Sequence, residues 1–207
     1  ADLMSEGIYG PIENPRYAEN VDIIRDQGRH LLSIINNVID AAKLTRGAPP
    51  HLSIETVDLR PIIETSIRSV EVQDGNNHRF EQCIRDGAAW VRGDQRALRQ
   101  ILDNLLTNAR KYTPAGAEVR VDSEVRHGMV LLSVSDDGPG IPAHMLDKLT
   151  EPFWRADHVL NAAQEGTGLG LTICDGLCAA MGAQMRILSE VGQGTRVEVE
   201  LSPGSDR

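Results

Sequence analysis

Two asparagines, a lysine and a tyrosine share one stripe of a predicted helix. Asn104 and Asn108 are four residues apart, and Lys111 and Tyr112 extend the line by one turn. Residues at this spacing lie one above the other on a helix. Amide oxygens, an ammonium group and a phenol in such a line could hold a hydrated Mg²⁺ and phosphate oxygens. Taken alone, the stripe is more typical of an ordinary polar helix face.

Two glycine-rich segments follow along the chain. The segment 136–140 (Asp-Asp-Gly-Pro-Gly) ends a predicted strand, where Asp136 could accept a hydrogen bond from an amino group. A plain Asp/Gly turn is the commoner meaning of such a string. The segment 166–170 (Gly-Thr-Gly-Leu-Gly) opens a predicted helix, where free N–H groups and the helix dipole favour phosphate. It is neither a Walker sequence nor a dinucleotide fingerprint.

The residues between these two segments show little regular pattern. They contain Phe153 and Trp154, two of only seven aromatic residues in the chain. A long irregular stretch inside a domain is usually functional, and we expect a mobile lid over a ligand. The alternative is a hydrophobic plug that anchors a loop.

Strands and helices alternate after residue 50. The pattern predicts strands at 51–57, 79–84, 88–91, 118–126, 129–135, 184–188 and 195–201. Asp58 and Gly93-Asp94 are expected to cap two helices, the second running to about Tyr112, and a third helix spans 169–181. Hairpins outnumber parallel crossovers, so we expect a two-layer α/β fold, a mixed sheet with helices on one face.

The first part of the chain has a different pattern. Residues 19–45 form a predicted helix with Ile24, Leu31 and Val38 at a spacing of seven, as in the seam of a helical bundle or coiled coil. Ala1 to Glu6 could end an earlier helix. The change of pattern predicts two domains, 1–46 and 47–207.

Composition excludes several classes of protein. The net charge is −9 and seven residues are aromatic, so the basic surface and the stacking platforms of a nucleic-acid binder are absent. No apolar run is long enough for a membrane helix, and we expect no secretory leader. Cys83, Cys174 and Cys178 form no CxxC, which favours a reducing, cytoplasmic setting. Cys174 and Cys178 are one helical turn apart, and we expect them to be packed, inert thiols rather than metal ligands.

Four segments, in their order along the chain, resemble the N, G1, F and G2 boxes of the sensor histidine kinases, a branch of the GHKL ATPases: the asparagine stripe, the segment 136–140, the stretch with Phe153 and Trp154, and the segment 166–170. The matching strings are Asn-x-x-x-Asn-Ala-x-Lys-Tyr, Asp-x-Gly-x-Gly-Ile, Pro-Phe-x-Arg and Gly-x-Gly-x-Gly-Leu. The resemblance covers about residues 50–202 and implies a Bergerat-type α/β sandwich. The helix 19–45 resembles the second helix of the family's dimerisation and histidine-phosphotransfer hairpin.

The resemblance implies ATP as the ligand and Mg²⁺ as its metal. Asn108 would coordinate the Mg²⁺ that bridges the phosphates, with Asn104 beside it as the second metal residue. Lys111 would contact phosphate and Arg155 would approach it. Asn104, Lys111 and Arg155 are therefore the implied catalytic residues.

The resemblance also implies where the rest of the nucleotide binds. Asp136 would take the adenine amino group, and Tyr112 would border the nucleotide. The remaining implied contacts come from the glycine boxes, the F box and a late threonine: Gly138, Gly140, Ile141, Phe153, Gly166, Thr167, Gly168, Leu169, Gly170 and Thr195. Asp137 stands where the family often has Asn, which disturbs none of these roles.

The implied activity is transfer of the ATP γ-phosphoryl group to a histidine and then to an aspartate of a response-regulator receiver domain, in a homodimer formed through the helical bundle. None of the six histidines matches the family's phosphoacceptor segment, so we expect that histidine just upstream of residue 1. The alternatives are a GHKL ATPase or anti-sigma-type serine kinase, and a nucleotide-responsive scaffold without kinase activity.

Overall fold

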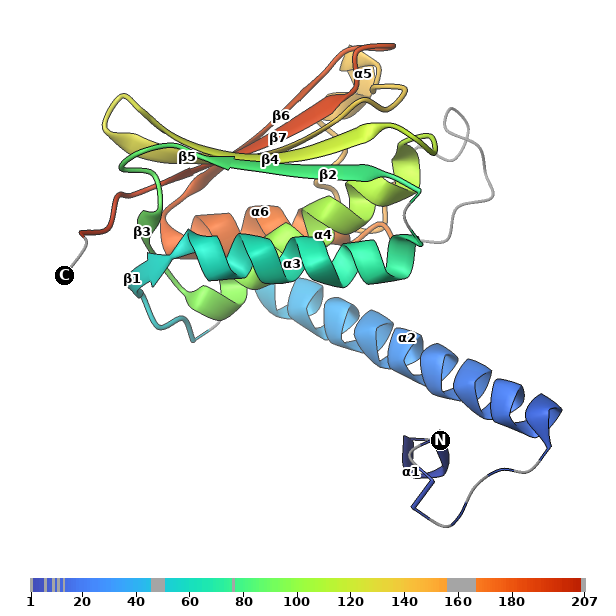
Figure 1. Cartoon of the computed structure of the whole chain (residues 1–207). Coiled ribbons are helices and arrows are strands. Elements are labelled where there is room, and N and C mark those ends of the chain that lie inside the picture. Colours follow the sequence, from blue (N-terminus) through green and yellow to red (C-terminus); the bar gives the residue numbers. More distant parts are fainter. Residues whose placement is uncertain are drawn as a thin grey trace. The chain divides into compact units, whose positions relative to one another are not determined.

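Figure 1 shows the computed structural model of the chain. It describes residues 2–5, 7, 8, 10, 12, 14–45, 51–75, 77–155 and 167–205. The chain forms two compact units, residues 1–40 and 41–207. The division into functional domains 1–46 and 47–207 stays a prediction.

The first unit is mainly helical. It contains α1 (Asp2–Ser5) and most of α2 (Pro15–Thr45). Helix α2 begins four residues before the predicted start, because Pro15 suits a first helical turn and the Asn14 side chain accepts the Arg16 N–H at 3.0 Å. The apolar residues at a spacing of seven, Ile24, Leu31 and Val38, are exposed.

The second unit contains the main sheet, which is ordered β2-β4-β5-β7-β6. Its strands are β2 (Arg79–Ile84), β4 (Glu118–Arg126), β5 (Met129–Asp136), β6 (Gln184–Ser189) and β7 (Thr195–Leu201). Among these described strands, the β2–β4 pair is parallel and the others are antiparallel. The two-residue turn His127-Gly128, with φ of 50° and 79°, joins β4 to β5 as predicted.

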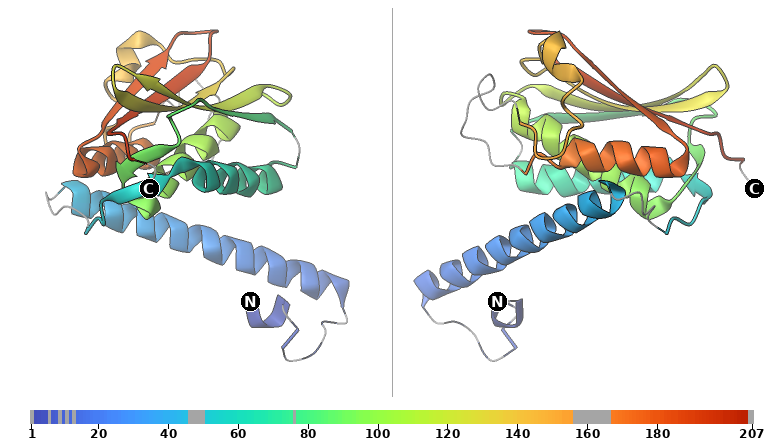
Figure 2. Two further views of the ribbon diagram at one scale, coloured as in Figure 1. Left: turned by 60° about the vertical axis from the view of Figure 1, so that its left-hand side comes forward. Right: turned by 180° about the vertical axis from the view of Figure 1, so that it is seen from behind.

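Three helices form the second layer. The views of Figures 1 and 2 agree that α3 (Leu59–Asp74), α4 (Gln95–Tyr112) and α6 (Gly170–Met181) lie on one face of the sheet. The apolar side of α4 is buried through Ala97, Leu98, Ile101, Leu102, Leu105, Leu106 and Ala109. The predicted two-layer α/β fold is therefore confirmed.

The second unit also differs from the predicted elements, and the strand predicted at 88–91 is found at Trp90–Gly93. Strands β1 (Glu55–Asp58) and β3 (Trp90–Gly93) pair with each other in a separate small sheet. Residues 51–54 are not in a strand, and the Ser53 N–H donates to the Asp94 carboxylate at 2.8 Å instead of to a ladder partner. A short helix, α5 (Ala143–Leu146), lies in the stretch predicted to be irregular.

The two helical cysteines are packed as predicted. Cys174 and Cys178 are free and buried in the core. Burial raises the pKa of both thiols, that of Cys178 to about 12, which makes them inert near neutral pH. Across the described ranges, no helix is both long and apolar enough to cross a membrane.

We expect Asp94 to be a main determinant of the position of α4. Its carboxylate accepts the N–H groups of Arg96 and Ala97 at 2.9 Å, as well as that of Ser53. Asp94→Ala should lower the free energy of unfolding by about 1–2 kcal/mol in urea titrations. Asp94→Asn should lose less, because its amide oxygen still caps the helix.

The effect of Asp94→Ala should depend on pH. Burial raises the pKa of Asp94, but the three backbone N–H donors lower it by more, so it lies below 3.8. The stabilisation is then complete above pH 3.8 and is lost as the pH falls through the lower, folded-state pKa. The difference in stability between wild type and Asp94→Ala should shrink over that range. A difference that stays constant with pH would contradict this role.

Candidate functional site

The structure brings the asparagine stripe against the second glycine segment. The Asn104 Nδ2 atom donates to the Gly170 carbonyl oxygen at 3.4 Å. A Cβ atom on Gly170 would stand 3.7 Å from the Asn108 side-chain nitrogen. Both asparagines are half-buried. Residues 66 positions apart in sequence therefore meet at the start of α6, where helix N–H groups lack intrahelical partners.

Asp136 lies at the end of β5, directly opposite Thr195 of β7. Its carboxylate accepts the Gly138 N–H at 2.9 Å. Burial raises the pKa of Asp136, and hydrogen bonds from backbone N–H groups of Gly138 and Thr195 offset only part of that rise. A half-buried carboxylate at the end of a strand can give a base-specific contact.

The first glycine segment is held by close backbone contacts. A Cβ atom on Gly140, which has φ of +69°, would overlap the Glu190 carbonyl oxygen, and one on Gly194 would overlap the Asp136 carbonyl oxygen. Glycine allows such an approach because it has no side chain. These close contacts hold the loop after β5 against the β6–β7 turn.

Ser189 also holds the loop after β5 against the β6–β7 turn. This role of Ser189 was not predicted from the sequence. Its hydroxyl accepts the Ile141 N–H at 2.8 Å and also bonds the Gly194 carbonyl and the Thr195 hydroxyl at 2.8 and 2.9 Å. Ser189 ends β6, and nothing in its sequence context signals this role.

The Pro-Phe-x-Arg string, residues 152–155, folds back on the second glycine segment, 166–170. The Phe153 N–H donates to the Gly168 carbonyl at 3.1 Å. Gly168 has φ of +68°, and a Cβ atom there would come 2.8 Å from the Trp154 carbonyl oxygen. The Phe153 side chain is 64% exposed, so it is not a buried plug.

The remaining predicted residues have mixed positions. Thr167, Lys111 and Arg155 are half-buried, Leu169 is fully buried and Tyr112 is 36% exposed. Gly166 and the predicted lid from residue 156 onward lie outside the described residues. The individual roles of all the predicted site residues stay predictions.

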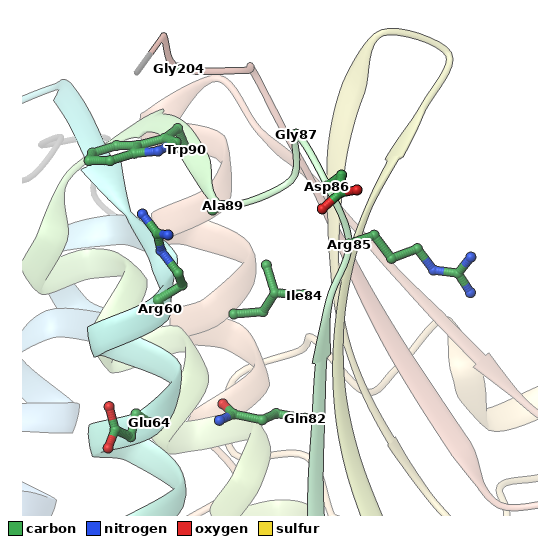
Figure 3. A pocket seen from close by; sticks show the side chains of 10 residues that line it. All are labelled: Arg60, Glu64, Gln82, Ile84, Arg85, Asp86, Gly87, Ala89, Trp90 and Gly204. Atoms are coloured by element: carbon green, nitrogen blue, oxygen red, sulfur yellow. The ribbon is translucent and has the colours of Figure 1, made fainter. Parts of the chain in front are cut away.

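A separate cavity lies elsewhere in the second unit. It has a volume of about 700 Å³ and opens between α3 and β2, where the Arg60 guanidinium lies over the Trp90 ring at 5.6 Å (Figure 3). Arg60 also bonds Asp58 at 2.9 Å. The residues that line the cavity include none from the described parts of the four predicted segments. The cavity is therefore distinct from the candidate site.

Comparison with known proteins gives a consistent result. Residues 93–205 match the family described as histidine kinase-, DNA gyrase B-, and HSP90-like ATPase. The histidine protein kinase DivJ of Caulobacter vibrioides is 35% identical over 97% of this chain and 33% of its own length. The cell-division control histidine kinase PdhS of Brucella abortus is 30% identical over 98% of this chain and 20% of its own length.

Two solved structures of histidine kinases are similar to this chain. Full-length ShkA in complex with AMPPNP has a TM-score of 0.79 at 28% identity, covering 99% of this chain and 42% of ShkA. A mycobacterial sensor histidine kinase, MprB, has a TM-score of 0.63 at 28% identity, covering 73% of this chain and 100% of the MprB chain. The chain belongs to the histidine kinase-, DNA gyrase B- and HSP90-like ATPase family, in its sensor histidine kinase branch. It spans about a third of the length of DivJ.

The close approach at Gly140 can be tested against a matched glycine. Gly116 has φ of +88° but open space where a Cβ would stand. Both Gly→Ala substitutions should cost about 1–2 kcal/mol for the left-handed backbone. Gly140→Ala should cost about 1–3 kcal/mol more, because its methyl group meets the Glu190 carbonyl. Equal losses in urea unfolding would show that the loop adjusts freely.

Proposed function

We propose that this chain is the ATP-binding catalytic portion of a sensor histidine kinase, which transfers the γ-phosphoryl group of ATP to a histidine. The observation that carries the proposal is the meeting of Asn104 and Asn108 with Gly170 at the start of α6. It puts side-chain amides and helix N–H groups at one place, which suits a phosphate chain.

Asp136 would define the adenine end of the site. When ionised, its carboxylate accepts hydrogen bonds only, and adenine presents an exocyclic amino donor. The Gly138 N–H already orients one carboxylate oxygen. Gly138 is buried, and a Cβ atom there would come 3.3 Å from the Tyr112 carbonyl and overlap the Asp136 carboxylate. This position therefore has no room for a side chain, and the Gly138 backbone packs directly against Asp136 and the end of α4.

Asn104 and Asn108 would hold Mg²⁺. Amide oxygens are suitable ligands, and Mg²⁺ usually takes few protein ligands together with waters and phosphates. Within the described ranges, no three His, Cys, Asp or Glu side chains gather as an alternative metal site. The ion would neutralise charge on the phosphate oxygens. Lys111 and Arg155 would add positive charge, and the chain's part in catalysis would be mainly positioning.

The full protein would act with a histidine-bearing helix and a receiver domain. The chain matches only 33% of DivJ, so the phosphoacceptor histidine, the response-regulator aspartate and dimerisation through α2 are part of this proposal. The exposed seam of α2, with Ile24, Leu31 and Val38, supports a partner helix. The cysteine usage supports a cytoplasmic location.

Nucleotide titration tests the site. We expect Asp136→Asn to weaken ATP binding at least about tenfold, because an amide nitrogen replaces an acceptor oxygen. Asp137→Asn is the matched control: it removes the same charge from the exposed neighbouring residue and should bind ATP as wild type does. Asn108→Ala should remove the gain in affinity that Mg²⁺ gives over EDTA. Equal affinities in all variants would refute the assignments.

The pH dependence of binding gives a second measure of the Asp136 contact. Burial raises the pKa of Asp136 above 3.8. The ATP affinity of the wild type should therefore decline as the pH falls toward that raised pKa, since a protonated carboxyl loses acceptor capacity. Asp136→Asn should lack this decline.

Phosphotransfer separates the proposal from its alternatives. With radiolabelled ATP, we expect phosphohistidine on a separate fragment that carries the upstream helix, and none on this chain alone. Phosphate release or phosphoserine without phosphohistidine would favour an ATPase or a serine kinase. No ATP binding even at millimolar concentration would favour a scaffold.

A further inference from the structure

A buried Asp–His pair joins the end of α3 to the residue before β2. The His78 Nδ1 atom lies 2.7 Å from the Asp74 carboxylate, which also accepts the His78 backbone N–H at 2.7 Å. The His78 and Asp74 side chains are only 6% and 3% exposed. Burial raises the pKa of Asp74, but the hydrogen bonds from His78 outweigh it and hold the pKa below its ordinary value.

The other ring nitrogen of His78 reaches the end of α4. Its Nε2 atom lies 3.0 Å from the Thr113 carbonyl oxygen. Both ring nitrogens thus face oxygen atoms, one of a carboxylate and one of a backbone carbonyl. Thr113 is the C-cap of α4, with its N–H bonded to the Ala109 carbonyl. His78 therefore offers a donor to a carbonyl that the helix cannot satisfy itself.

The surrounding backbone couples the same two segments. The Gly116 N–H donates to the Asn77 carbonyl at 2.6 Å, and the Arg79 N–H donates to the Ala117 carbonyl at 3.0 Å. Residues 77–79 and 113–117 are consequently held together, with the His78 ring as a buried side-chain link between them.

These linked segments lie against the proposed adenine site. A Cβ atom on Gly138 would lie 3.3 Å from the Tyr112 carbonyl oxygen and 3.5 Å from the Thr113 hydroxyl. Gly138 in turn bonds Asp136. A shift of the Thr113 backbone would move the surface against which Gly138 packs.

We propose that His78 is a positioning residue for the adenine end of the site, acting through the Thr113 carbonyl. The proposal rests on the proposed function, since it takes Asp136 and Gly138 as the residues that recognise the base. The contact with Asp74 fixes the His78 ring, and the contact with Thr113 fixes the end of α4.

Two amide substitutions separate the two contacts. The side-chain nitrogen of Asn can replace Nδ1 of a histidine, and that of Gln can replace Nε2. His78→Asn should therefore keep only the Asp74 contact, and His78→Gln only the Thr113 contact. We expect His78→Asn to bind ATP about five- to tenfold more weakly, and His78→Gln to bind within about twofold of wild type. Both should lose thermal stability, since each breaks one buried hydrogen bond.

Three measurements distinguish positioning from a general loss of stability. ATP and ADP affinities should fall by the same factor in His78→Asn, because the phosphate end is unaffected. The amide resonance of Gly138 in the nucleotide-free protein should shift in His78→Asn and keep its wild-type position in His78→Gln. His127→Asn, in the exposed β4–β5 turn at φ of 50°, is the matched control and should change neither quantity.

The outcomes are distinct. Equal ATP affinity in His78→Asn and His78→Gln, or a changed ratio of ATP to ADP affinity, would overturn the positioning role while leaving the proposed function intact. No ATP binding by the wild-type chain would overturn both.

Discussion

The candidate site depends on the packing of one amphipathic helix. Helix α4 buries seven apolar side chains within the core of the second unit. Such burial contributes roughly 1.5–3 kcal/mol for each large side chain, and it fixes the rotation of the helix about its axis. Because the rotation is fixed, Asn104 and Asn108 must face the start of α6. The polar stripe therefore lies at the candidate site because the apolar face of the same helix is buried in the core.

A second constraint is the proximity of backbone segments. The loop after β5, the β6–β7 turn and the segment before α6 approach their neighbours too closely for side chains at Gly140, Gly194 and Gly168. Each of these glycines also has a positive φ. Two independent reasons thus require glycine at each position. Ser189 then bonds β6 to the loop and the turn, so the site is a set of interlocked turns on a rigid sheet.

How much of the fold could be predicted depends on the range of the interactions. Local signals were sufficient for α4, its Asp94 cap and the β4–β5 turn, because periodicity and capping act within a few residues. The pairing of β1 with β3 was missed, because both strands have only four residues and their partnership is set by tertiary packing. The residues of the candidate site also divide into those that the sequence indicates and those that only the fold reveals. Asparagines and glycine strings are recognisable by type and order, whereas Ser189 and His78 act through bonds to residues that only the fold brings near.

The two glycine segments meet α4 at different points along its length, which fits the proposal that one helix serves both ends of a bound nucleotide. Nine residues, about 13 Å of helix, separate Asn104, which contacts Gly170, from Thr113, which lies against Gly138. The base and phosphates of a nucleotide are joined covalently, so their separation has a fixed limit. A rigid helix that sets the spacing between the two glycine segments can match that separation without further adjustment. The side chains of Asn104 and Asn108, which this helix positions, are uncharged amides, so the phosphate contacts proposed for them are compatible with a net charge of −9.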